Sequence, residues 1–270
     1  MANPSRTKPL DCGKITDWGQ YQMISCRITF SAIPPQQFFC QGAEPPLTGL
    51  DPALITAPVD GTNVSYDTTS RFLTYLNFAT NSGQKTAIDD FAREFLRIVG
   101  FEEHGFALRT GYTIPLSNHD SSNQAHMDVC LLDRRSMILL VLQDEKPSLN
   151  PSNLEPQMIA LAIVTYQHNN QIRKLMGLSE LDTMIVPFIT MVGTRPIFYL
   201  VPVTEELNDA ASFAKCSVVE TEVLKCVTVA GPDRRLREGM ETPEYRRVAF
   251  QHMIAFKAMA KSHWEKFLLD

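Results

Sequence analysis

The 270-residue chain lacks any long apolar run, and this absence limits where the protein can reside. No stretch approaches the roughly 20 consecutive apolar residues that a membrane-spanning helix requires. The N-terminal segment, from Met1 to Pro9, also lacks the apolar core of a secretory signal. We therefore expect an intracellular protein, cytoplasmic or nuclear, with no membrane partner.

Paired metal-binding and redox motifs are also absent. The six cysteines are scattered without a C-x-x-C pair, so we expect reduced, partly buried thiols. His104, His119, His126 and His168 do not follow the spacing of a zinc site, and we expect them on the surface or in loops. The chain has no G-x-S-x-G motif and no glycine-rich phosphate loop, so serine and cysteine nucleophiles have no supporting motif.

The chain contains a modest fraction of charged residues. Charged residues make up 20% and hydrophobic residues 44% of the chain, which favours a sizeable folded core over disorder. The net charge of −5 is unlike that of proteins that permanently coat nucleic acid, which are usually basic. An enzyme with a local basic rim is still compatible with this charge. Arg134-Arg135 and the cluster at 234–237 are interpreted either as phosphate contacts or as solvated loops.

The chain divides into two parts by composition. Residues 1–66 are rich in Pro, Gln, Thr and Gly, with one strand-like segment over 21–30, and are expected to form an extended arm or cap. Residues 67–270 are expected to form one domain, with a core unit over 84–192. The patterns predict helices over 68–79, 84–99, 155 onward, 205–214 and 243–268, and strands over 106–114, 124–132, 137–146, 183–192, 196–203 and 216–229.

This order of elements predicts an α/β fold: a central mixed β-sheet flanked by helices, with an N-terminal extension and a C-terminal helix. The closing helix has one broad apolar side. That side either packs on the core or faces a second copy of the chain, so a homodimer is one expectation.

Charged residues interrupt the strand candidates at the centre of the core unit. Asp128 lies within one apolar strand, and Asp144 and Lys146 close the next one. Side chains of a strand alternate between faces, so Asp144 and Lys146 leave the same face. If the two strands form a hairpin around Asp133 to Ser136, the two aspartates lie on neighbouring strands about 4.8 Å apart and can share a divalent cation. The bland alternative is a solvated strand end before a proline-rich loop.

This pattern resembles that of the PD-(D/E)XK, or restriction-endonuclease-like, nuclease superfamily, and most closely its divergent fungal-type members. The superfamily motif is an Asp on one strand and Asp/Glu-x-Lys on the next, which Asp128 and Asp144-Glu145-Lys146 match. Members often carry a Glu on the preceding helix and a Gln on the following one, and Glu94 and Gln157 occupy those places. The resemblance covers roughly 110 of the 270 residues, from 84 to 192.

The resemblance implies a Mg²⁺-dependent, or Mn²⁺-dependent, endonuclease that hydrolyses phosphodiester bonds in DNA or RNA. The implied metal ligands are Asp128, Asp144, the backbone carbonyl of Glu145, and Glu94 through a water. A purely structural role for Glu94, paired with Arg97 or Arg93 on its own helix, is an open alternative.

The other implied catalytic residues act beside the metal. Lys146 would orient or help to deprotonate the attacking water, and Gln157 would position Lys146 or a phosphate. Gln157 could instead only satisfy a nearby backbone group. Two other functions stay open: a catalytically inactive nuclease-fold protein that acts as a binding module, and a hydrolase of another phosphorylated substrate.

Overall fold

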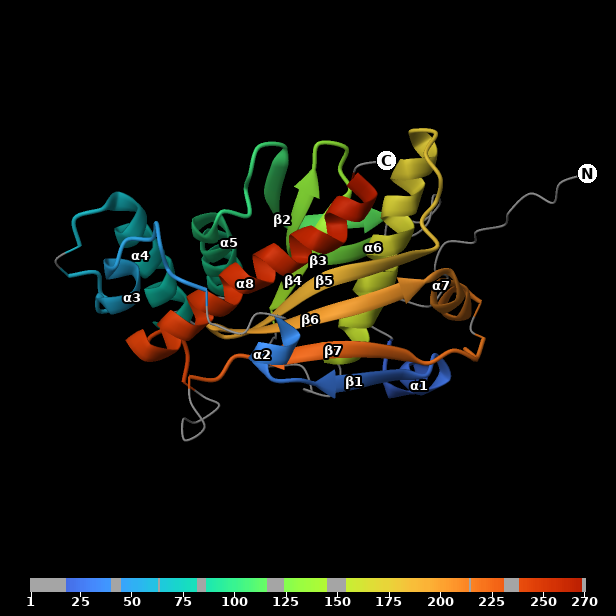
Figure 1. Ribbon diagram of the computed structural model, residues 1–270, viewed down its shortest axis with the longest axis horizontal. Coiled ribbons are helices and arrows are strands. Elements are labelled where there is room, and N and C mark those ends of the chain that lie inside the picture. The colour runs from blue at the N-terminus through green and yellow to red at the C-terminus, as the bar shows by residue number, and fades with distance from the viewer. Residues whose placement is uncertain are drawn as a thin grey trace, which may run out of the picture.

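A mixed β-sheet organises the protein, as the computed structural model shows (Figure 1). The structure describes residues 18–39, 45–62, 64–81, 86–115, 124–144, 154–213, 215–230 and 238–268. The helices are α1 (Gln20–Ser25), α2 (Pro35–Phe38), α3 (Ala53–Thr56), α4 (Asp67–Asn81), α5 (Thr86–Val99), α6 (Leu154–Leu175), α7 (Glu205–Ser212) and α8 (Pro243–Leu268). The strands are β1 (Ile28–Ala32), β2 (Phe106–Pro115), β3 (Gln124–Asp133), β4 (Ile138–Asp144), β5 (Thr183–Val192), β6 (Arg195–Thr204) and β7 (Thr221–Val227).

The strand order in the sheet is β1-β7-β6-β5-β4-β3-β2 among the described residues. The pairs β1–β7 and β4–β5 are parallel, and the other neighbours are antiparallel. Strand β4 is apolar from Ile138 to Leu142 because it lies inside the sheet with both faces covered. The predicted α/β fold, a central mixed sheet flanked by helices with a C-terminal helix, is confirmed.

Helices cover both faces of the sheet. Helices α5 and α8 pack on one face, and α8 crosses it diagonally (Figure 1). Phe198 of β6 contacts Phe256 and His252 of α8, with ring centroids 4.8 and 6.5 Å apart. Helix α6 packs on the opposite face, where Glu155 reaches Lys225 of β7. The apolar side predicted for the C-terminal helix therefore packs on the core.

The segment expected to be an arm or cap contributes to this core within its described part. Strand β1 extends the sheet beside β7, and Trp18, Phe38 and Leu54 are buried. The strand predicted over 21–30 was wrong in its first half, which is α1. There the Gly19 N–H donates to Gln22 Oε1 at 2.9 Å and supports the first helical turn.

A buried arginine fastens this N-terminal segment to α8. Arg246 is fully buried, and its guanidinium donates to the carbonyls of Leu54 (3.1 Å), Ala57 (2.8 Å) and Met240 (2.7 Å). A guanidinium can satisfy several carbonyls at once because its donors point in fixed, different directions. The sequence around α3 therefore belongs to the same packed unit as the C-terminal helix.

Within the described ranges, no helix combines the length and the apolar character needed to cross a membrane.

Candidate active site at the end of the β3–β4 ladder

The hairpin predicted around residues 133–136 is present. Strands β3 and β4 pair antiparallel, and the Asp133 side chain closes the turn by accepting the N–H groups of Arg135 (2.9 Å) and Met137 (2.8 Å). An aspartate that bonds to the backbone two residues ahead is a common turn signal. The hairpin places Asp128 and Asp144 on adjacent strands, at the end of the ladder away from the turn.

The strand ladder breaks at Asp128. The last β3–β4 pair is Val129 with Leu142. On the other side, β2 pairs Thr110 with Val129 and then Tyr112 with Met127, and no pair joins Gly111 to Asp128. Gly111 has a φ of 61°, a left-handed conformation that glycine adopts at little cost.

The Asp128 carboxylate replaces the missing backbone partner. Its Oδ2 accepts the backbone N–H of Asp144 at 2.9 Å, and its Oδ1 lies 3.7 Å from Nε2 of His126. Regular alternation from Val129 and Leu142 would send the two aspartate side chains to opposite faces. The Asp128 carboxylate instead lies beside the backbone of β4 where the ladder stops.

Both aspartates are buried, with relative exposures of 4% for Asp128 and 5% for Asp144. A carboxylate is costly to bury unless hydrogen bonds or a cation compensate its charge. The described compensation of Asp128 is one backbone N–H and an exposed histidine. Asp128 and Asp144 are therefore not solvated, whereas Glu145 and Lys146, which the bland alternative also includes, lie outside the described residues.

Glu94 is close to the core but engaged by two arginines. Its Oε1 accepts from Arg71 Nε (2.9 Å) and Arg97 Nη2 (2.7 Å), and its Oε2 accepts from Arg97 Nε (2.8 Å). Burial alone raises the pKa of Glu94, but the hydrogen bonds from Arg97 and Arg71 outweigh it, so the net pKa lies below its usual value. These contacts agree with the structural alternative, with Arg97 as its predicted partner and Arg71 as an additional one.

The other predicted site residues are placed less fully. Gln157 lies in the first turn of α6 and is half-buried. Glu145 and Lys146 lie outside the described residues. Of the five predicted catalytic residues, Asp128 and Asp144 lie on adjacent strands, and the Asp128 carboxylate accepts the backbone N–H of Asp144; this contact does not involve the Asp144 carboxylate.

A complete metal cage is not seen in the described parts of the chain, because no three His, Cys, Asp or Glu side chains there converge on one point. Mg²⁺ does not need such a cage. It commonly keeps several waters and binds through one or two carboxylates. Asp128 and Asp144 carry the hard oxygen donors that Mg²⁺ prefers, but the contact between them runs from Asp128 Oδ2 to the backbone N–H of Asp144, and the regular register directs the two carboxylates to opposite faces of the sheet.

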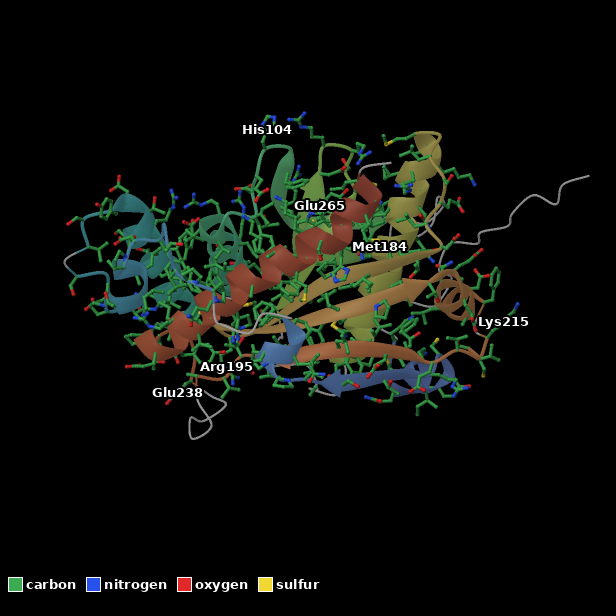
Figure 2. The ribbon with its side chains drawn as sticks, in the orientation of Figure 1. His104, Met184, Arg195, Lys215, Glu238 and Glu265 are labelled. Atoms are coloured by element: carbon green, nitrogen blue, oxygen red, sulfur yellow. The ribbon has the colours of Figure 1, made fainter. Side chains whose placement is uncertain are left out.

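The remaining sequence expectations concern cysteines and histidines. Cys130 and Cys226 are buried free thiols and Cys216 is an exposed one, as expected for reduced, partly buried cysteines, and Cys26 is buried. Burial raises the pKa of Cys130 to about 12, so its thiol stays protonated at neutral pH. His104 is exposed and points outward from the turn before β2 (Figure 2). The residues His119, Cys12, Cys40 and 234–237 lie outside the described ranges.

Sequence reasoning missed several polar residues near this site. Strand alternation could have predicted that His126 lies beside Asp128, because it precedes Asp128 by two residues and therefore shares its face of the strand. Gln143, Thr190, Tyr199 and Lys225 form a row across the sheet. Nothing in the sequence indicates that row, because it depends on the register of strands far apart in the chain.

Comparison with models of known protein families and with curated proteins gives no match to this chain.

Proposed function

We propose that the protein is a metal-dependent nuclease that hydrolyses phosphodiester bonds in DNA or RNA. The observation that carries the proposal is the pair of buried aspartates. The Asp128 carboxylate lies 2.9 Å from the backbone nitrogen of Asp144, where β3 separates from β4. Acidic residues buried at a break in a central sheet are better explained by a cation than by packing. The PD-(D/E)XK resemblance, which rests on the same two aspartates together with Lys146, Glu94 and Gln157, points to the same function.

The residues divide the chemistry between them. Bound Mg²⁺ or Mn²⁺ would stabilise charge on the phosphate and activate a water. Asp128 and Asp144 would hold the ion, with the backbone carbonyl of Glu145 as a further ligand. Lys146 would orient the attacking water and offset developing negative charge. Gln157, in the first turn of α6, would position Lys146 or a phosphate.

In this proposal the main role of Glu94 is to bind the guanidinium groups of Arg71 and Arg97. Both of its oxygens already accept hydrogen bonds from guanidinium groups. Direct coordination would require the ion to displace at least one of these strong, charged hydrogen bonds. A water-mediated contact to the ion leaves them intact, so this is the form of Glu94 ligation that the proposal retains.

The proposal also covers the substrate, the cellular compartment and the oligomeric state. The expected substrate partner is nucleic acid, in the cytoplasm or the nucleus. The apolar side of α8, which was the argument for a homodimer, packs on the core, so light scattering of the purified full chain is needed to tell a monomer from a dimer.

The experiment is a cleavage assay with plasmid, single-stranded DNA and RNA, with and without Mn²⁺. The Asp144→Asn variant keeps the shape of the side chain and removes its charge. We expect metal-dependent cleavage to be lost in Asp144→Asn and retained in Asp209→Asn, an exposed aspartate on α7. Equal cleavage by wild type and Asp144→Asn would refute the site assignment.

The second candidate function is a non-catalytic binding module with this fold. The observation that favours it is Glu94, whose carboxylate is fully occupied by arginines. A calorimetric titration that shows no heat with Mg²⁺ or Mn²⁺, together with no cleavage of any substrate, would select this function.

A further inference from the structure

Strand β1 leaves one of its two edges open. It is the last strand on its side of the sheet, at the lower margin of Figure 1, and among the described residues it pairs only with β7. An open edge invites another chain to add a strand, and proteins usually protect such edges with charged residues, glycine kinks or proline. Strand β2, at the other margin, has these features in Arg109, Gly111 and Pro115. Strand β1 has the sequence Ile-Thr-Phe-Ser-Ala and contains none of them.

The backbone groups on this open edge follow from the bonds that flank β1. Arg27 O accepts an N–H from the β7 side at 3.0 Å, and the Ile33 N–H donates to a β7 carbonyl at 2.9 Å. In a parallel ladder only alternate residues of a strand bond to the same neighbour, so the odd-numbered residues of β1 bond to β7. The N–H and C=O groups that point away from β7 belong to the other three residues, Ile28, Phe30 and Ala32.

Two carboxylates lie along the same margin. Glu220 precedes β7, Glu222 is its second residue, and both are exposed. Glu220 Oε1 accepts from the Thr29 hydroxyl at 3.2 Å, and Glu222 Oε1 accepts from the Ser31 hydroxyl. Both carboxylates are therefore held toward β1, on one face of the sheet and two residues apart. A strand added to β1 would meet this pair with alternate side chains, because strand side chains repeat with a period of two.

Exposed apolar side chains gather at the α1 end of the open edge. Tyr21 and Ile24 of α1 are 78% and 74% exposed, and Val218, shortly before β7, is 79% exposed. Arg27, which follows α1, donates to Val218 O at 3.0 Å, so the two segments lie side by side. Large apolar side chains that share one part of the surface commonly mark a site that a partner covers.

The charges on this margin indicate the kind of partner. If β1 paired antiparallel with β1 of a second copy, the two-fold axis would bring both pairs of carboxylates to one face of the joined sheet. Four negative charges along one seam repel one another, whereas lysine or arginine side chains opposite them attract. Within the described ranges, Arg27 donates to the backbone and Lys215 lies over the Phe213 ring, so neither cation pairs with the carboxylates.

We propose that the open edge of β1 is a docking site for an extended, basic segment of a partner protein. The segment adds a strand to the sheet by bonding to the outward N–H and C=O groups of β1. Its alternate lysine or arginine side chains pair with Glu220 and Glu222, and an apolar side chain covers Ile24. Three strands separate β1 from β4, so the docking site is independent of the aspartate pair and of the proposed nuclease function.

The test is fluorescence anisotropy of a labelled peptide, Leu-Val-Lys-Val-Lys-Val-Thr, titrated with the purified full chain. We expect saturable binding that weakens as NaCl is raised, since salt screens surface ion pairs. The double variant Glu220→Gln with Glu222→Gln should bind several-fold more weakly because two cross-strand ion pairs are lost. Ala32→Pro should bind about tenfold more weakly because proline removes an outward N–H, and it leaves the β7 ladder intact because that N–H does not bond to β7.

Two matched controls separate local from general effects. The double variant Glu205→Gln with Asp209→Asn removes the same charge from two exposed acids on α7, and it should bind the peptide like the wild type. The peptide Leu-Val-Glu-Val-Glu-Val-Thr keeps the alternating pattern with the opposite charge and should not bind. Thermal unfolding of each variant identifies any that fail to fold.

The outcomes decide the docking site without reference to cleavage. Binding that requires Glu220, Glu222 and the Ala32 N–H supports it, whether or not the protein cuts nucleic acid. An absence of binding by the lysine peptide, or equal weakening in the two double variants, would overturn it. A wild-type dimer in light scattering that Ala32→Pro converts to a monomer would also overturn it, because the edge would then belong to a second copy.

Discussion

The clearest energetic prediction concerns Glu94. Replacing it by Gln removes the charge that Arg71 and Arg97 share and leaves one carbonyl acceptor in place of two carboxylate oxygens. A hydrogen bond to a charged group contributes about 1.5–3 kcal/mol. The Glu94 side chain is only 8% exposed, but those of Arg71 and Arg97 are 50% and 33% exposed, so solvent screens part of the interaction.

We therefore expect Glu94→Gln to lower the free energy of unfolding by about 2 kcal/mol at neutral pH. At roughly 2–4 °C per kcal/mol, this corresponds to a fall in Tm of about 4–8 °C. Urea unfolding followed by circular dichroism measures the difference directly. Glu103→Gln is the control, because Glu103 also pairs with two cations, Lys257 and Lys261, but is more exposed, and its loss should cost about 1 kcal/mol or less.

The pH dependence provides a second check on the same variant. The folded-state pKa of Glu94 lies below its usual value, so its stabilisation is complete above the unfolded pKa. It is lost as the pH falls through the folded-state pKa. The stability difference between wild type and Glu94→Gln should therefore be constant at neutral pH and shrink once the pH falls below the ordinary carboxyl pKa of 4.5. Equal stabilities at neutral pH, or a difference that grows in acid, would refute this reasoning.

Three further predictions concern the core and the strand break. His252 is buried with a pKa lowered to about 4, so its contribution to wild-type stability should fall by roughly 1 kcal/mol per pH unit between about pH 6.5 and pH 4 and level off below, and urea midpoints of His252→Gln should show a flatter slope over that window. Arg246→Met leaves the carbonyls of Leu54 and Ala57 without their donor and should destabilise the fold by about 3 kcal/mol in urea unfolding. Gly111→Ala should cost about 1 kcal/mol because its φ of 61° strains any side chain, although the added carbon has space; an unchanged urea midpoint would contradict this.

The sequence predicted the strands of the sheet well where the apolar periodicity and the turn-forming residues agree. The β3–β4 hairpin followed from two apolar runs separated by Asp133 to Ser136, and Asp133 does close that turn. The segment over 21–30 failed because its mixed apolar pattern does not separate a short helix from a strand. The positive φ of Arg27, 52°, which divides α1 from β1, has no glycine to indicate it.

The site was predicted only in part, because the sequence does not specify the register of the strands. Position in the chain placed Asp128 and Asp144 on neighbouring strands, and this is what the structure has. The break opposite Gly111 and the bond from the Asp144 N–H to the Asp128 carboxylate both depend on strand register that the sequence does not specify. The engagement of Glu94 by Arg71 likewise joins two helices, and only their packing brings the two side chains together.

The most direct test of the central claim is a calorimetric titration of wild type and Asp128→Asn with Mn²⁺. Asparagine keeps a carbonyl oxygen that can accept the Asp144 N–H, so the variant should retain its fold while losing a charged ligand. We predict saturable Mn²⁺ binding by the wild type and binding at least about tenfold weaker in Asp128→Asn. Indistinguishable titrations of the two folded proteins, or no binding by either, would contradict the assignment of these aspartates as a metal site.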